Sequence, residues 1–287
     1  MKSLYPAFIS VLVLFILITF DLLTIKRILD YPLLANISTI LFGIVMFLAQ
    51  ILIALKFFKL SEIGFTSKNL FLTFVYGLVL VIPFFVFRQL YFPQQFNPNL
   101  NLNFILIAVP LLLIFALVEE LVFRGILFTT INKWKGAEVA LFTSSVAFGL
   151  FHLITPMMGV SSINTALGYT TTQIGIGTLF LGLSYGMIYY RSGNLIGTAI
   201  VHFIYNLTNV FYTLKPSQEL NLPDSAYSLS FGLFVFTPLG IDYLHSKLSK
   251  KDKPAKFSWS IYLAWIFVFI FLFFLGSDLL TDLKIME

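Results

Sequence analysis

The sequence predicts an all-α fold, a polytopic transmembrane bundle of eight to nine spanning helices with a buried polar site between spans 4, 5 and 7. Composition is the first observation behind this prediction. Of the 287 residues, 59% are hydrophobic and only 11% are charged, whereas roughly a quarter of the residues in an ordinary soluble domain are charged. The second observation is that the apolar residues form uninterrupted runs long enough to cross a bilayer as helices. We therefore expect lipid around most of this protein.

The apolar runs indicate nine candidate spans, each about 18 to 30 residues long. The first run follows Lys2 as a signal sequence would, but no small-residue cleavage site comes after it, so we expect a retained anchor. No soluble domain or repeat interrupts the series, which predicts one integral membrane domain over residues 1–287. The candidate spans are residues 5–25, 34–58, 70–90, 102–131, 137–154, 172–190, 194–215, 228–246 and 258–280.

The basic residues between the spans predict the orientation. When the loops are assigned alternately to the two sides, twelve Lys and Arg residues fall on the side of Lys2 and five on the other. Because cytoplasmic loops carry the excess of basic residues, we expect a multi-pass protein of the cell membrane with a cytoplasmic amino terminus. Nine spans would place the carboxyl terminus outside, and eight would place it inside. The basic segment 247–256 is the clearest cytoplasmic loop and could also contact anionic lipid.

Two features of the composition exclude classes of function. The chain has no Cys, which removes disulfides, thiolate metal sites and Cys nucleophiles. Its net charge of +5 could suggest nucleic acid. The basic residues lie in short loops, however, where the positive-inside bias accounts for them without a polyanion. We expect the lipid bilayer as a partner, and no nucleic acid.

Ionisable side chains inside apolar spans point to the functional site, because each costs several kcal/mol in hydrocarbon. Three spans carry the informative residues: the fourth (FALVEELVFRG), the fifth (VAFGLFH) and the seventh (GTAIVHFIYN). The residues are Glu119, Glu120, Arg124, His152, His202 and Asn206. At about 1.5 Å per residue, Glu119 lies about 18 Å deep from the cytoplasmic side, His152 about 22 Å and His202 about 12 Å. We expect them to meet in one layer near mid-membrane.

Spacing within the helices suggests roles for these residues. Glu120 and Arg124 are four positions apart, which predicts an ion pair. Glu119 points in another direction, has no basic residue four positions on, and is left as the unpaired carboxyl that a general base or acid requires. His202 and Asn206 share one helical face and suit an oxyanion as two neutral hydrogen-bond donors.

Two other residues are expected to have structural roles. His245 lies at a loop edge beside Lys247, which favours a solvated surface position. Phe148, like the other phenylalanines, is expected to pack or to face lipid.

The three motifs resemble those of the CAAX protease and bacteriocin-processing family of intramembrane proteases, which includes the type II prenyl-protein endopeptidases. They are Glu119-Glu120-x-x-x-Arg124, Phe148-x-x-x-His152 and His202-x-x-x-Asn206, in a core of residues 102–215. The resemblance implies that Glu119 activates the attacking water and that His152 helps to hold it. It further implies that His202 and Asn206 stabilise the tetrahedral oxyanion, supported by Glu120 and Arg124.

The resemblance implies an intramembrane endopeptidase that hydrolyses a peptide bond of a membrane-associated or lipidated peptide, without a catalytic metal. The residues favour the same absence of zinc, because there is no HExxH motif. A zinc site made of Glu119, His152 and His202 would leave no unpaired carboxyl as the base. The ninth span and the long loop of residues 155–171 depart from the prenyl-protease branch, so a prenylated substrate stays open.

Other interpretations compete with the protease. Glu120 and Arg124 could only join helices, and His152 could only be an interhelical hydrogen bonder. A transporter or proton relay also buries Glu, His and Arg, but it would show paired, broken segments in two related halves, and none is visible. A non-catalytic membrane scaffold or immunity protein is the third class, and such a protein has no reason to bury Glu119, His152 and His202 together.

Overall fold

In the computed structural model, residues 4–28, 32–91, 94–98, 100–157, 171–214, 224–249 and 263 are described. Within this part of the chain, helices occur where the first eight spans are predicted. They are α1 (Tyr5–Ile28), α2 (Pro32–Phe57), α3 (Leu70–Tyr91), α4 (Leu102–Glu120), α6 (Ala137–Met157), α7 (Thr171–Ser192), α8 (Leu195–Phe211) and α9 (Asp224–Leu248). Apart from residue 263, the predicted ninth span lies outside the described residues, as does most of the loop 155–171.

The fourth span is not one uniform α-helix. After α4 the chain forms a π-helix, η2 (Leu121–Phe128), and then a short α-helix, α5 (Thr129–Lys135). The prediction of a single α-helix over 102–131 is therefore wrong in its second part. Every residue of η2 is buried, and an apolar run with one charged residue does not distinguish a π-helix from an α-helix in the sequence.

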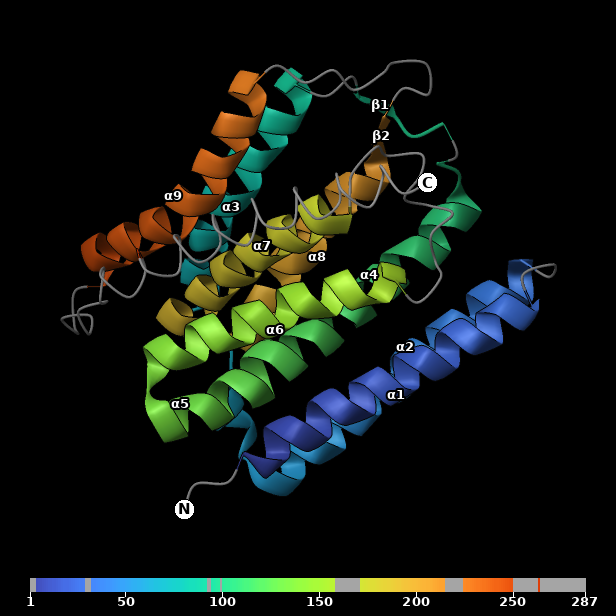
Figure 1. The fold of residues 1–287 in the computed structure, drawn as a ribbon, viewed down its shortest axis with the longest axis horizontal. Helices are drawn as coiled ribbons and strands as arrows, with labels where there is room; N and C mark the ends of the chain where they lie inside the picture. The colour runs from blue at the N-terminus through green and yellow to red at the C-terminus, as the bar shows by residue number, and fades with distance from the viewer. Residues whose placement is uncertain are drawn as a thin grey trace, which may run out of the picture.

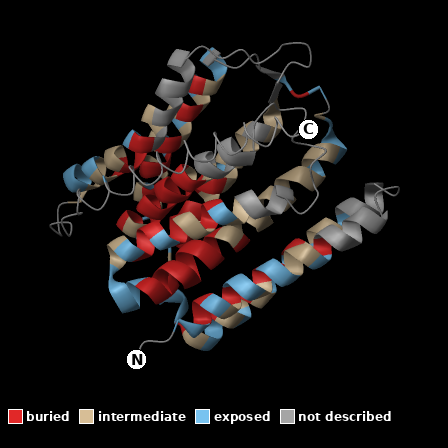
Figure 2. Ribbon diagram, viewed as in Figure 1, coloured by how far each residue is buried: buried red, intermediate tan, exposed pale blue. Residues whose placement is uncertain are grey.

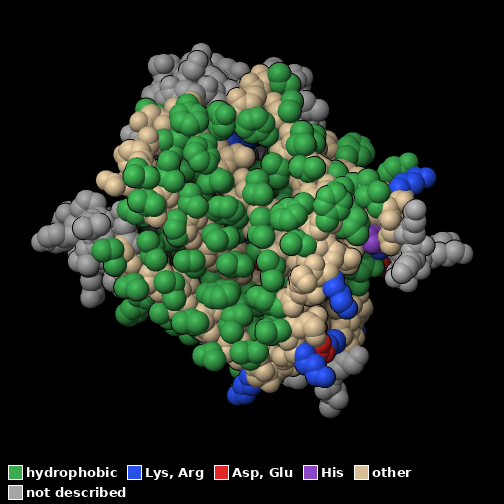
Figure 3. Space-filling view, turned by 180° about the vertical axis from the view of Figure 1, so that it is seen from behind, with side chains coloured by type: hydrophobic (Ala, Val, Ile, Leu, Met, Phe, Trp, Pro, Cys, Tyr) green, Lys and Arg blue, Asp and Glu red, His purple; other side chains and the backbone are tan. Residues whose placement is uncertain are grey.

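The chain is a helical membrane protein. Three described helices are long and apolar enough to cross a bilayer, namely Ile37–Phe57, Leu70–Leu90 and Leu102–Lys135, and the shorter apolar helices include Ala137–His152 and Leu195–Thr208. Hydrophobic side chains cover most of the face in Figure 3, with lysine and arginine near its lower and right edges. That every helix spans the bilayer stays a prediction.

The helices are arranged around a buried centre (Figure 1). The antiparallel pair α1 and α2 lies along one flank, and α3 and α9 lie along another. The pair is joined by two hydrogen bonds, from Ser10 Oγ to Gln50 Oε1 (2.6 Å) and from Gln50 Nε2 to the Ser10 carbonyl (3.0 Å). Buried residues concentrate where η2, α6, α7 and α8 meet, whereas α1 and α2 expose many side chains (Figure 2).

Helices α6 and α7 approach each other closely at Gly182. A Cβ at this position would lie 3.0 Å from Phe148 Cδ1 and 3.1 Å from the Ser145 carbonyl oxygen, both on α6. Contacts of this length are tighter than nine in ten real Cβ contacts, so the separation of the two helices depends on a residue without a side chain. The glycine therefore brings α7 to the wall of the buried centre.

At one end of the bundle, the connection between α2 and α3 holds the beginning of α8. It contains the short 3₁₀ helix η1 (Leu60–Ile63) and Gly64, whose φ of 77° favours glycine. The Leu195 N–H donates to the Gly64 carbonyl (2.8 Å), and Asn194 Nδ2 donates to the Lys68 carbonyl (2.6 Å). Asn194 also caps α8 by accepting from the Gly197 N–H (2.7 Å). These bonds fix the position at which α8 begins.

At the opposite end, two short strands depart from the all-α prediction. Strand β1 (Gln94–Phe96) precedes α4, and β2 (Tyr212–Leu214) follows α8. They pair antiparallel, with Gln94 opposite Leu214 and Phe96 opposite Tyr212. The chain needs this pairing to satisfy backbone groups where two helices end, and three residues are too few to show as a strand pattern in the sequence.

His245 is only partly exposed, and the prediction of a solvated histidine is wrong in part. Its Nδ1 is 2.7 Å from the hydroxyl of Tyr76, a fully buried residue of α3. One turn away on α9, Asp242 forms an ion pair with Arg191 of α7. These contacts join three helices through polar groups.

Candidate active site

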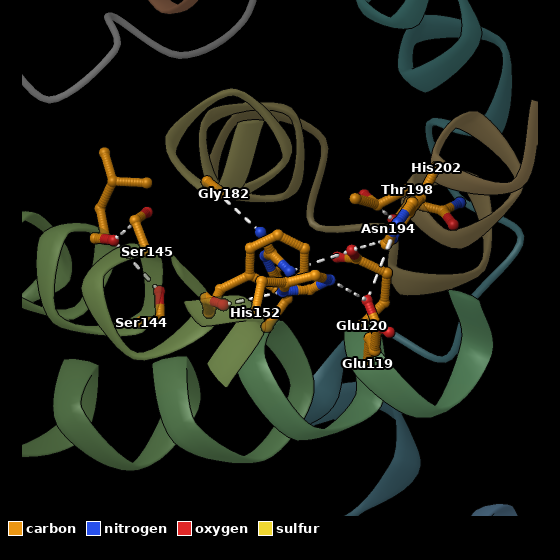
Figure 4. A network of polar contacts seen from close by, with 12 residues as sticks. Glu119, Glu120, Ser144, Ser145, His152, Gly182, Asn194, Thr198 and His202 are labelled. Atoms are coloured by element: carbon orange, nitrogen blue, oxygen red, sulfur yellow. Dashed lines mark hydrogen bonds and ion pairs between the residues drawn. The ribbon is translucent and has the colours of Figure 1, made fainter. Parts of the chain in front are cut away.

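Glu119, His152 and His202 converge in the buried centre (Figure 4). The Glu119 side chain comes from the end of α4, His152 from α6 and His202 from α8. Glu119 Oε2 lies 3.7 Å from His152 Nε2 and 3.8 Å from His202 Nε2. These distances are too long for direct hydrogen bonds, and Glu119 Oε2 is buried without a hydrogen-bond partner among the described residues. The three side chains thus face a common point without direct hydrogen bonds between them.

Glu120 forms the ion pair that its spacing predicts. Arg124 Nη1 donates to Glu120 Oε1 at 3.0 Å, and both side chains are fully buried. The second guanidinium nitrogen, Nη2, donates to the Gly182 carbonyl of α7 at 2.9 Å. The guanidinium also lies 4.4 Å from the centre of the Phe148 ring, a cation–π contact. Arg124 therefore joins η2 to both α6 and α7.

A backbone carbonyl orients His152. Its Nδ1 lies 2.9 Å from the carbonyl oxygen of Phe148, one turn earlier in α6. Because a carbonyl can only accept, Nδ1 carries the proton and Nε2 of the neutral ring presents a lone pair. That lone pair is on the nitrogen nearest to Glu119.

Glu120 orients His202 in the same sense. His202 Nδ1 lies 2.9 Å from Glu120 Oε1, the oxygen that also accepts from Arg124. A carboxylate paired with a guanidinium is an acceptor, so His202 Nδ1 donates. A neutral His202 therefore has no donor at Nε2, contrary to the expectation of a neutral donor. It can donate to an oxyanion only as an imidazolium, which Glu120 is placed to stabilise.

Asn206 lies one turn beyond His202 on α8 and is partly exposed. The structure gives it no hydrogen bond to a described residue. Glu119 and His152 are also partly accessible, with 15% and 27% of their side chains exposed, whereas Glu120 and Arg124 are fully buried.

Sequence reasoning missed the contribution of the sixth span. The site was expected between spans 4, 5 and 7, yet α7 contributes the Gly182 carbonyl and the ring of Tyr185, which stacks on His202 at 4.5 Å. Neither residue has an acidic, basic or imidazole side chain, and such side chains within the apolar spans are what indicated the site in the sequence. Phe148 packs as expected, but its ring also contacts Arg124 and its carbonyl orients His152. The repeated glycines Gly182 and Gly186 were the available sign of a close helix contact.

Within the described residues, no group of three or more His, Cys, Asp and Glu side chains is arranged to hold a metal ion.

Residues 101–208 match the Rce1-like family. This family is described as type II CAAX prenyl endopeptidase Rce1-like, and the resemblance predicted from the three motifs is confirmed. No curated protein and no solved structure matches the chain. The Rce1-like segment, residues 101–208, contains Glu119, Glu120, Arg124, His152, His202 and Asn206. Helices α1, α2, α3 and α9 lie outside it.

Proposed function

We propose that this chain is an intramembrane endopeptidase that uses Glu119 to activate water. The observation that carries the proposal is the convergence of the unpartnered Glu119 carboxyl and two oriented Nε2 atoms inside the segment that matches the Rce1-like family. Each imidazole is held by its other nitrogen, as in sites where a ring must face a reacting group. A structural ion pair needs none of this orientation.

The charges of the cluster favour a mobile proton. Glu120 and Arg124 neutralise each other, which leaves the Glu119 carboxylate with one uncompensated negative charge. In a layer with little water, one proton shared among Glu119, His152 and His202 makes the cluster neutral. The distances of 3.7 and 3.8 Å allow one water molecule to contact Glu119 and an imidazole together.

The proposed reaction is the hydrolysis of an amide. Glu119 and His152 hold a water molecule, Glu119 takes its proton, and the water oxygen attacks the carbonyl carbon of the peptide bond. Asn206 and the His202 imidazolium donate to the resulting oxyanion. Glu119 then returns the proton to the peptide nitrogen, the C–N bond breaks, and an acid and an amine leave. No step requires a metal ion.

The substrate class follows from where the site lies. Because the cluster is within a helical membrane protein, the scissile bond belongs to a peptide that is itself held at or in the bilayer. The name of the matched family adds a prenylated protein as one such substrate. We propose a membrane-associated or lipidated peptide.

The deciding experiment compares the purified wild type with Glu119→Gln. Both are incubated in lipid with membrane peptides from the host, and products are identified by mass spectrometry. We expect products from the wild type alone, because the amide cannot take the proton of water, while the two proteins remain equally folded. Near-normal cleavage by Glu119→Gln would refute the mechanism.

A further inference from the structure

Tyr185 of α7 is a buried residue at the site that the proposed reaction does not yet use. It has 1% of its surface exposed, and its hydroxyl has no hydrogen-bond partner among the described residues. Buried hydroxyls in proteins are almost always hydrogen-bonded. A phenylalanine would fill the same space without this cost, so the hydroxyl needs an explanation.

The ring of Tyr185 stands directly against the proposed catalytic groups. It stacks on the imidazole of His202, with 4.5 Å between ring centres and 22° between planes. Its edge meets Phe148 at 6.3 Å, and the Arg124 guanidinium lies 5.5 Å from its centre. The two rings lie face to face, so Tyr185 is in direct contact with the His202 imidazole.

Close packing of α7 against α6 fixes this position. Gly182 and Gly186 lie on either side of Tyr185 along the chain. A Cβ at Gly186 would lie 2.6 Å from Leu141 Cδ1, and one at Gly182 would lie 3.0 Å from Phe148 Cδ1. Arg124 of η2 also donates to the Gly182 carbonyl, which joins α7 to η2 at the same position. The tyrosine is therefore held rigidly in the site.

From this geometry we infer that the Tyr185 hydroxyl is a further hydrogen-bond donor to the carbonyl oxygen of the substrate, acting with Asn206 and His202. The partner missing from the hydroxyl is then the peptide itself. No covalent bond to Tyr185 forms or breaks, and its proton stays on the hydroxyl. The inference rests on the proposed endopeptidase function and adds a residue to its oxyanion site.

The test removes one oxygen atom. Tyr185→Phe keeps the ring stack, and Tyr189→Phe is the matched control, because Tyr189 is buried one turn later on α7 and packs against Phe128 instead. The substrate is the peptide that mass spectrometry shows to be cleaved by the wild type and not by Glu119→Gln. We expect Tyr185→Phe to lower kcat about a hundredfold with little change in KM, and Tyr189→Phe to leave both unchanged.

The outcomes separate the two proposals. If the wild type cleaves no peptide, or Glu119→Gln cleaves normally, the proposed function fails and this inference fails with it. If those two proteins behave as expected but Tyr185→Phe keeps the wild-type kcat or raises only KM, the donor role alone is overturned. A loss of thermal stability in Tyr185→Phe relative to the wild type would show that the hydroxyl is structural and would likewise overturn it.

Discussion

Glu120 binds two partners through one oxygen atom. Its Oε1 accepts from both Arg124 and His202, so the same carboxylate neutralises a guanidinium and orients an imidazole. Loss of Arg124 would leave Glu120 buried without its counter-ion. Loss of the Glu120 charge would leave Arg124 with only the Gly182 carbonyl and the Phe148 ring as partners and would also release the ring of His202. The two residues support the site in different ways.

Replacement of either partner should therefore give different defects. Arg124→Ala strands Glu120 as a buried charge and should lower the free energy of unfolding by about 3 kcal/mol. Glu120→Gln should lower the free energy of unfolding less than Arg124→Ala does. It should nevertheless lose activity, because an amide no longer fixes the proton of His202 on Nδ1. Thermal denaturation and peptide cleavage measured on both variants check this. Equal and mild effects on stability would show that the pair contributes nothing.

Asn206 is the simpler test of the oxyanion site, since an amide cannot act as a base. Asn206→Ala should lower kcat about a hundredfold to a thousandfold with little change in KM, because the donor is needed most in the transition state. Steady-state kinetics on the cleaved peptide measure this. A variant with raised KM and unchanged kcat would make Asn206 a substrate-binding or packing residue.

Metal removal tests whether the activation of water requires a metal ion. If Glu119 and the imidazoles activate the water alone, prolonged chelation should leave cleavage unchanged, and elemental analysis of the active protein should find no stoichiometric zinc. Loss of activity that zinc restores would assign Glu119, His152 and His202 as ligands instead.

At the scale of elements, the contact between α6 and α7 places two groups of the site. Gly182→Ala should push the helices apart, because its Cβ would meet the Ser145 carbonyl oxygen at 3.1 Å. Overpacking of this kind typically costs about 1–3 kcal/mol, and the displaced carbonyl should also weaken Arg124 binding and cleavage. Gly232→Ala of α9 is the control, since its Cβ would have an ordinary contact of 3.9 Å with Phe236 Cδ2. Equal thermal stability of both variants would contradict the prediction.

The loop between α2 and α3 offers a pH-dependent contact outside the spans. Hydrogen bonds from Lys133 Nζ (2.7 Å) and from the Lys59 N–H (2.7 Å) lower the pKa of the Glu62 carboxyl from its ordinary 4.5. A lowered folded-state pKa means that the contact stabilises above 4.5 and is lost as the pH falls through the lower value. NMR titration of the Glu62 carboxyl should show this shift. Lys133→Met should bring the pKa back towards 4.5.

The sequence could predict helices and motif residues because each leaves a local signal. Long apolar runs mark the helices, and Glu119, His152 and His202 are visible because charges and imidazoles are costly in hydrocarbon. The π-helix, the Gly182 carbonyl and Tyr185 could not be found this way. These features depend on which helices pack against each other, and the sequence of α7 alone does not indicate that His202 packs against it. The bond between Glu120 and His202 is likewise a contact across 82 positions.

At the scale of the molecule, basic residues gather at one end of the described bundle, around the turn before α8. Lys59, Lys68 and Lys133 lie at this end, and β1 and β2 lie at the other. We expect the lysine-rich end to face the cytoplasm. Because the chain has no Cys, labelling of a single introduced cysteine shows on which side of the membrane that position lies, with no labelling of native thiols.

Labelling with a membrane-impermeant maleimide tests this orientation. In intact cells, Phe96→Cys in the exposed β1 strand should react, and Lys68→Cys should react only after lysis. The reverse pattern would show that the lysine-rich end is outside and that the amino terminus is not cytoplasmic. Labelling of both variants in detergent controls for access.

The π-helix in η2 changes how related sequences must be aligned through this segment. Its eight residues, Leu121–Phe128, separate Glu119 and Glu120 from α5 and from everything that follows. A π-helix holds about one residue more in each turn than an α-helix, so removal of one residue here would let an α-helix form while the residues after it keep nearly the same direction relative to the two glutamates. A one-residue gap between Leu121 and Phe128 in such an alignment therefore indicates an unbroken α-helix with α5 in nearly the same direction, whereas the same gap in a regular α-helix would turn everything after it by about 100°.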